Sequence, residues 1–205
     1  MSSKQEAILV VDYKRRFIWL DSGEKEAVIN SSLASGVIGM LKKLDSLSNE
    51  MIIFYIRGRG GDVYAMMRVA VTIEAMRSPV TFVPFDFVRS ASFWVTQYGR
   101  MRLSLGGTKF MFHRAAQSVR VDYKTLTQVD CLVTLDRLKL VDGIQLWAYS
   151  RRGRPISKIA ELLLGESILT TEMAIKYRLI DGLYDEKDFD KDKKIAIELA
   201  KKKYG

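Results

Sequence analysis

Apolar runs alternate with stretches of helical periodicity along most of the chain. The run MIIFYI at 51–56 predicts a strand covered on both faces, because a strand with one solvated face would alternate apolar and polar residues. Residues 29–47 carry apolar side chains every three or four positions, which predicts a helix. A second helix is expected over 63–76 and a second buried strand over 80–87. Strands that alternate with helices indicate an α/β fold.

Shorter patterns complete this plan. Strands are expected at 16–20, 101–105 and 109–113, and helices at 90–98, 155–164, 171–177 and 189–203. The helical pattern at 122–149 is longer than a compact crossover between strands needs, so we expect this helix to project and pack against another subunit. We expect one α/β domain over residues 1–185, followed by a charged helix or tail over 186–205.

The composition restricts the chemistry open to the chain. It has 205 residues with one Cys and one His, which excludes a disulfide framework and ordinary structural zinc sites. Cys131 lies in an apolar helical pattern and is expected to pack. No apolar stretch approaches the roughly 20 residues that span a bilayer, and we expect a cytoplasmic protein without membrane contact. An imidazole, if the chemistry uses one, must come from His113.

The positive charge is spread along the chain. Lys and Arg number 33 against 24 Asp and Glu, a net charge of +9 carried in small clusters. A nucleic-acid module concentrates basic residues on one face, often with stacking aromatic side chains. We therefore expect a solvated basic surface, and nucleic-acid binding is an alternative that only the net charge supports.

Three features with chemical potential lie at the ends of expected strands or at a helix start. The pair Gly60-Gly61 follows the 51–56 strand and can serve as a tight turn, a phosphate cradle or an oxyanion hole, although the P-loop spacing is missing. Ser90 begins a helix, where a serine acts as an N-cap or as a nucleophile. His113 ends the 109–113 strand. Together they are the parts needed for acyl transfer by a Ser-His pair.

Four segments carry a resemblance to a known family. IRGRGG at 56–61 is similar to a strand followed by a Ser-Pro-Gly-Gly loop, and 88–99 is similar to an Ala-Ala-Ser-Met-Gly segment with its apolar helix. FMFH at 110–113 and AIKYRLID at 174–181 resemble the family's Val-Met-Ile-His and Ala-Val-Glu-Tyr-Gly-Leu-Ile-Asp segments. These segments resemble the Clp-type serine peptidases of the Clp protease/crotonase superfamily. The resemblance covers roughly residues 16–185 and implies repeated ββα units with a long projecting helix, at about 122–150, as an oligomerisation handle.

The resemblance also implies roles for individual residues. It implies a catalytic triad of Ser90, His113 and Glu166, an oxyanion hole from the backbone N–H groups of Gly61 and Ala91, and substrate contacts at Gly60 and Val119. It implies a serine endopeptidase that cleaves unfolded polypeptides without a cofactor or metal. The chains would form homo-oligomeric rings, stacked through the long helix, with an AAA+ ATPase unfoldase as partner.

Alternatives follow from departures from the family pattern. Arg59 replaces the loop proline, Arg89 replaces a small residue before the nucleophile, and Glu166 replaces aspartate. These changes motivate an inactive scaffold subunit as a second reading, and the superfamily motivates a crotonase-like acyl-CoA enzyme as a third. Ser92, two residues along the same turn, is an alternative nucleophile.

Overall fold

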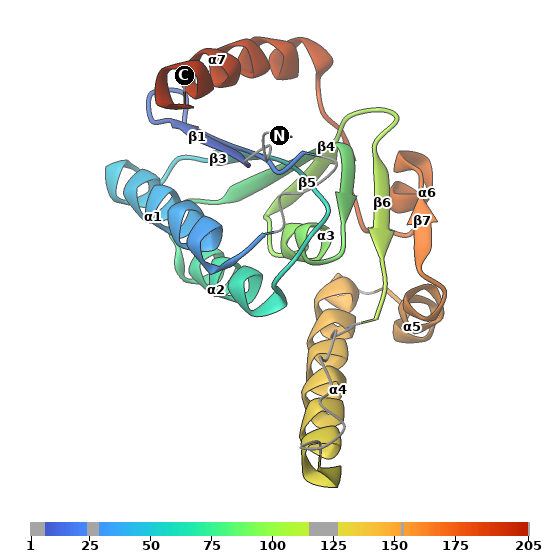
Figure 1. Cartoon of the computed structure of the whole chain (residues 1–205). Helices are drawn as coiled ribbons and strands as arrows, with labels where there is room; N and C mark the ends of the chain where they lie inside the picture. The colour runs from blue at the N-terminus through green and yellow to red at the C-terminus, as the bar shows by residue number, and fades with distance from the viewer. Residues whose placement is uncertain (1–6, 24–28, 115–126, 153, 205) are drawn as a thin grey trace, which may run out of the picture.

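A computed structural model describes residues 7–23, 29–114, 127–152 and 154–204 of the chain. Within these ranges it holds a mixed sheet whose strands are β1 (Ile8–Asp12), β2 (Phe17–Asp21), β3 (Ile52–Gly58), β4 (Val80–Arg89), β5 (Met101–Ser104), β6 (Lys109–Phe112), β7 (Ser167–Leu169) and β8 (Gly182–Leu183). The helices are α1 (Ser31–Leu47), α2 (Val63–Ala75), α3 (Ala91–Thr96), α4 (Gln128–Ser150), α5 (Ile156–Leu164), α6 (Thr171–Lys176) and α7 (Glu186–Tyr204). The expected α/β fold with a long projecting helix is confirmed (Figure 1).

The strands β2, β3, β4, β5 and β8 run parallel in that order, with β1 antiparallel to β2 at the edge. Strand β4 is long enough to have two neighbours on one side. Its first half pairs with β5, and its last residues pair in parallel with β6, which in turn pairs antiparallel with β7. Asp86, with φ of +59°, lies between the two halves. The sheet therefore branches at β4, just before the turn that carries Ser90.

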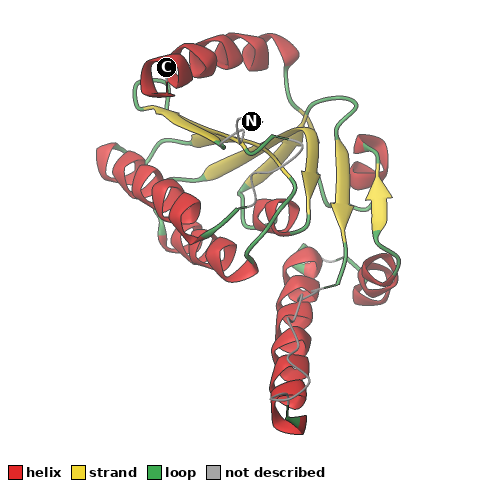
Figure 2. Ribbon diagram, in the orientation of Figure 1, coloured by secondary structure: helices red, strands yellow, loops and turns green. Residues whose placement is uncertain are grey.

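Helices cover both faces of the sheet (Figure 2). Helices α1, α2 and α3 pack on one face, where they bury the main apolar core. Helix α1 begins where the Asn30 side chain accepts a hydrogen bond from the N–H of Leu33, and α2 begins where Asp62 caps Tyr64 and Ala65 in the same way. The start of α2 is thus fixed directly after the Gly60-Gly61 turn.

Helix α7 covers the other face of the sheet. A second apolar cluster lies beneath it, formed by Val10, Phe17, Trp19, Tyr55, Val83, Phe85, Phe189 and Ala196. The last two belong to α7, and the buried Asp192 of the same helix accepts a hydrogen bond of 2.7 Å from the Tyr55 hydroxyl. The charged segment at 186–204 is therefore a helix docked on the sheet. The division of the chain into domains stays a prediction.

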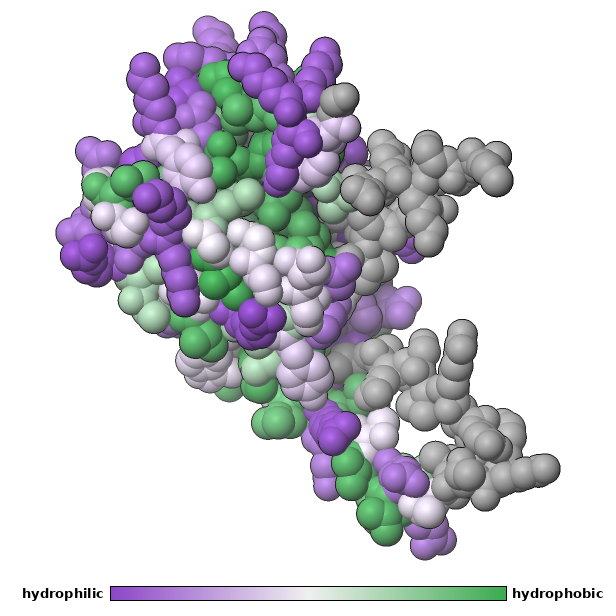
Figure 3. Space-filling model, turned by 60° about the vertical axis from the view of Figure 1, so that its left-hand side comes forward, coloured by the Kyte–Doolittle hydropathy of each residue, from purple (hydrophilic) through white to green (hydrophobic). Residues whose placement is uncertain are grey.

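Helix α4 extends away from the rest of the chain (Figure 1). The sequence predicted its start at Asp122, but Thr127 has an extended backbone and forms a capping box with Asp130, so the described helix begins at Gln128. Apolar side chains are exposed along it, namely Val129, Leu132, Val133, Leu135 and Leu140, and Figure 3 shows apolar atoms on this projection. Cys131 was expected to pack but is exposed, because this end of α4 reaches beyond the body.

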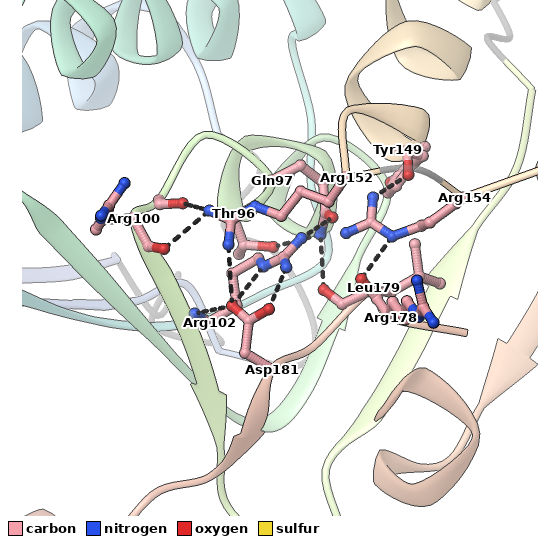
Figure 4. A network of polar contacts seen from close by, with 11 residues as sticks. Thr96, Gln97, Arg100, Arg102, Tyr149, Arg152, Arg154, Arg178, Leu179 and Asp181 are labelled. Carbon is pink, nitrogen blue, oxygen red and sulfur yellow. Dashed lines mark hydrogen bonds and ion pairs between the residues drawn. The ribbon is translucent and has the colours of Figure 1, made fainter. Parts of the chain in front are cut away.

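A buried polar network ties the segment before β8 to β5 (Figure 4). The Arg102 side chain is buried and forms an ion pair with Asp181, while its Nη1 donates to the Gln97 amide oxygen at 3.0 Å. Burial raises the pKa of Asp181, but the hydrogen bonds and charge of Arg102 outweigh this effect and lower it below its ordinary value. The network holds α3, which follows Ser90, against the C-terminal part of the fold.

Candidate active site

The Gly60-Gly61 turn lies directly against the turn of Ser90. Both glycines have positive φ, +93° and +147°. A Cβ atom on Gly60 would lie 2.7 Å from the Ser90 Cβ and 2.8 Å from the Arg89 carbonyl oxygen, so only glycine fits there. The turn is held by Ile29, whose N–H donates to the Gly60 oxygen at 2.9 Å and whose oxygen accepts from the Asp62 N–H at 2.8 Å.

Ser90 lies between the end of β4 and the start of α3 with φ of +51° and ψ of −128°. Such a backbone is unfavourable for a residue with a Cβ and persists only where the surroundings enforce it. Here the Ser90 N–H donates to the Met111 oxygen at 2.7 Å, and its carbonyl accepts from the N–H groups of Phe93 and Trp94. The hydroxyl makes no capping bond, so the N-cap reading of Ser90 fails and its side chain is free to face elsewhere.

The side chain of Ser90 faces His113. Strand β6 pairs with the end of β4 so that Arg89 lies opposite Met111, and His113 follows β6 directly. This register brings the two side chains together, with 3.1 Å between His113 Nε2 and Ser90 Oγ. Both residues are half-buried. The distance is that of a hydrogen bond, in which the hydroxyl donates if Nε2 is unprotonated.

Two backbone N–H groups beside Ser90 have no acceptor in the described part of the chain, those of Gly61 and Ala91. The Ala91 N–H belongs to the first turn of α3, where helix geometry provides no partner. Ile29 and Gly61 form a parallel β-bridge, in which Ile29 bonds to the Gly60 carbonyl and the Asp62 N–H. The Gly61 N–H takes no part in this bridge.

Glu166 is placed one residue beyond a strand pair. Strand β7 pairs antiparallel with β6, and the pairing ends with Ser167 opposite Phe112, so Glu166 and His113 each lie one residue outside it. Its side chain is exposed and its φ is +47°. Among the described residues, no hydrogen bond or ion pair joins Glu166 to His113. The two residues thus flank the last paired position of β6 and β7, without a bond between their side chains.

A cavity of about 340 Å³ opens beside Ser90 and His113. Its far wall is α4, which contributes Arg137, Leu138, Val141 and Gln145. Sequence reasoning missed this wall. The helical period could have indicated it, because Leu138, Val141 and Gln145 lie on one face of the helix. Gln145 is a polar residue within an otherwise apolar stripe.

The remaining predicted positions lie away from this cavity. Ser92, the alternative nucleophile, is fully buried, and its Oγ has no partner among the described residues. The Arg89 guanidinium lies over the Phe87 ring, 5.1 Å from its centroid. Arg59 and Arg89 do not line the cavity. Val119 lies outside the described residues.

The described part of the chain holds neither a metal-binding cluster nor a helix that could span a membrane. No group of three or more His, Cys, Asp or Glu side chains in that part of the chain is arranged to hold a metal ion. None of its helices combines the length and the apolar character needed to cross a membrane.

Comparison with known proteins identifies the family. A model of the Clp protease family matches residues 10–187. The ATP-dependent Clp protease proteolytic subunit of Deinococcus radiodurans is 25% identical over 161 residues, which cover 77% of each chain. The ATP-dependent Clp protease proteolytic subunit 1 of Bacillus cereus is 27% identical over 163 residues, which cover 78% of this chain and 82% of the relative. The resemblance expected from the sequence is confirmed, and the chain belongs to the Clp protease family, a family of serine endopeptidases.

Proposed function

We propose that this chain is the proteolytic subunit of a compartmentalised protease, in which Ser90 and His113 cleave unfolded polypeptides. The observation that carries the proposal is the 3.1 Å distance between Ser90 Oγ and His113 Nε2 at the wall of a cavity. A serine hydroxyl is a weak nucleophile until a base accepts its proton, and an imidazole at this distance does so.

In the proposed reaction the Ser90 Oγ attacks a peptide carbonyl while its proton passes to His113 Nε2. The C–N bond then breaks, and His113 gives this proton to the leaving amine, which leaves an ester on Ser90. A water molecule attacks the ester with His113 again as the base, which releases the acid and restores the hydroxyl. His113 carries both protons of this sequence, first from Ser90 to the leaving amine and then from the water to the Ser90 oxygen.

The N–H groups of Gly61 and Ala91 are proposed to bind the oxygen of the tetrahedral intermediate. Their lack of a protein acceptor in the described part of the chain supports this role, since each is free to donate to a developing oxyanion. Loss of one such donor typically costs about 10²–10³-fold in kcat. Gly60 supports the site by letting the loop approach Ser90 closely enough.

Glu166 is proposed as the third member of the triad, acting on the other ring nitrogen of His113. The β6–β7 pairing supports the assignment, because Glu166 and His113 each directly adjoin its last pair, Ser167 and Phe112. The exposed Glu166 side chain must rotate toward the ring before it can accept from Nδ1–H.

We further propose that the chain assembles into rings that stack through α4, and that an AAA+ ATPase unfoldase delivers the polypeptide. The exposed apolar residues of α4 support the assembly, because soluble helices seldom expose several large apolar side chains without a partner. The names of the two relatives, which are ATP-dependent proteolytic subunits, support the partner. The cytoplasmic location expected from the sequence stays a prediction.

An inactive scaffold subunit is the second candidate, and one observation favours it. No hydrogen bond or ion pair joins the exposed Glu166 to His113 among the described residues, and a triad without its orienting acid is weak. In this case the fold and the oligomer would form while peptides remained uncut.

Turnover of a fluorogenic peptide and of an unfolded protein separates the two candidates. We expect Ser90→Ala and His113→Ala each to lower kcat/KM by at least about 10³-fold, with unchanged melting temperatures. Ser46→Ala, an exposed serine on α1, serves as the matched control and should cleave at the wild-type rate. Equal activity in all four proteins would refute the proposal, and no activity in any folded, oligomeric sample would favour the scaffold.

A further inference from the structure

The residue proposed as the catalytic base lies beyond the end of its strand. Strand β6 ends at Phe112, and its pairing with β7 ends at the same residue. From there the chain runs toward α4 (Figure 1). Within the described ranges, neither His113 nor Arg114 takes part in a hydrogen bond between backbone groups. Strand pairing therefore does not fix the backbone that carries the imidazole.

A side-chain bond to helix α4 anchors this segment. Arg114 Nε donates to Asp142 Oδ2 at 2.8 Å, and the two side chains form an ion pair. The Asp142 side chain is only 18% exposed, so the pair is partly shielded from water although 57% of the Arg114 side chain is exposed. Because Arg114 follows His113 directly, the pair limits where the His113 backbone can lie relative to α4.

Helix α4 is held against the rest of the chain at this level. Its buried residues are Val141, Gln145, Ala148 and Tyr149, and the first of them directly precedes Asp142. Val141 also lines the cavity beside Ser90. Arg114 and Asp142 are not among the residues that line this cavity, so the pair is not placed to contact a substrate there. The pair can reach the reaction through the position of His113.

We propose that Arg114 and Asp142 are positioning residues that hold His113 Nε2 at hydrogen-bond distance from Ser90 Oγ. That distance is 3.1 Å, so a small movement of the segment would weaken the bond through which the proton passes. The inference rests on the proposed peptidase function and adds two residues to its machinery. A partly exposed ion pair is weak, so its loss should change the rate by a small factor.

A double-mutant cycle tests whether the two residues act as one unit. We expect Arg114→Gln and Asp142→Asn each to lower kcat for a fluorogenic peptide by about 2- to 5-fold with unchanged KM. The double variant should lose no more than either single variant, because both changes break the same bond. Wild-type kcat in either single variant, or losses that multiply in the double variant, would overturn the inference.

Asp136→Asn is the matched control for this cycle. It makes the same change on the same helix and breaks the exposed ion pair between Asp136 and Lys139, whose atoms are 3.7 Å apart. This variant should keep the wild-type kcat. A loss equal to that of Asp142→Asn would show that any change of charge on α4 has this effect, which would also overturn the inference.

The imidazole itself supplies a readout that needs no turnover. His113 is the only histidine of the chain, so the ring signals of protein labelled with ¹³C-histidine belong to it alone. Arg114→Gln and Asp142→Asn should both move these signals toward the position seen in the double variant, because all three release the same segment. A pure charge effect would move them in opposite directions, since the charges removed have opposite signs, and this result or unchanged signals would overturn the inference. Failure of the peptidase proposal is read separately, as absent turnover by the wild type.

Discussion

Replacement of Gly60 by alanine tests how the two turns hold Ser90 in place. The new Cβ would lie 2.7 Å from the Ser90 Cβ, 2.8 Å from the Arg89 oxygen and 3.0 Å from the Ala91 nitrogen. Two of these three neighbours are backbone atoms, and the third is fixed to the strained Ser90 backbone. Relief by a side-chain rotation is therefore not available, and the loop or the Ser90 turn must shift.

The size of the effect follows from the geometry. Carbon atoms pack at about 3.5–4.0 Å, so the contact of 2.7 Å requires a displacement of about 1 Å. A misplacement of about 1 Å at a reacting group costs about 10²-fold in rate, equivalent to about 2.7 kcal/mol in the barrier. The φ of +93° adds about 1–3 kcal/mol of backbone strain, which lowers the free energy of unfolding.

The assay measures two quantities for Gly60→Ala, the kcat/KM for a fluorogenic peptide and the free energy of unfolding in urea. Gly107→Ala is the matched control, because Gly107 has φ of +78° but nothing within 4 Å of the added Cβ. The control should lose stability and keep the wild-type kcat/KM, whereas Gly60→Ala should lose both. Wild-type kcat/KM in Gly60→Ala would refute the argument that close approach of this loop holds Ser90.

Three further predictions address the triad, the polar network and helix α1. Glu166→Gln should lower kcat by about 10²–10⁴-fold with little change in KM, while Glu166→Asp keeps more activity; equal rates in all three proteins would exclude Glu166 from the reaction. The pKa of Asp181 is lower in the folded chain than its ordinary value of 3.8, so its ion pair with Arg102 stabilises the fold fully at pH values above 3.8. This stabilisation is lost as the pH falls through the folded-state pKa. The melting temperature of the wild type should accordingly fall below about pH 4. Asp181→Asn should have a lower melting temperature at pH 7 and a weaker dependence on pH, and equal pH dependence in the two proteins would contradict this. Gly39→Ala, at an exposed and open position of α1, should raise the free energy of unfolding by about 0.5–1 kcal/mol in urea denaturation, and a loss of stability would show that the position is not open.

Much of the fold could be predicted because its signals are local. The apolar run at 51–56 and the caps Asn30 and Asp62 act within a few residues, and the structure has strands and helices where these patterns lie. Strand β1 was not predicted, because its four apolar residues, which precede Asp12, are too few to show a period. Strand β7 has three residues and exists only through its pairing with β6.

The residues of the candidate site likewise differ in whether local sequence features are enough to predict them. Ser90, His113 and Gly60 could be found from sequence, since strand ends and helix starts are local features and parallel strands end at one edge of a sheet. The cavity wall formed by α4 could not, because tertiary packing decides which face of α4 lies over the cavity. Glu166 is a third case, because it lies just outside the β6–β7 pairing and its distance from His113 depends on its rotamer.

Covalent labelling tests the central claim most directly. The wild-type protein is treated with a fluorophosphonate, which reacts with an activated serine, and the modified peptide is located by mass spectrometry. The account predicts one adduct per chain, on Ser90, formed at least about 10²-fold more slowly in His113→Ala. An adduct on Ser92, or no adduct on folded and assembled protein, would contradict it.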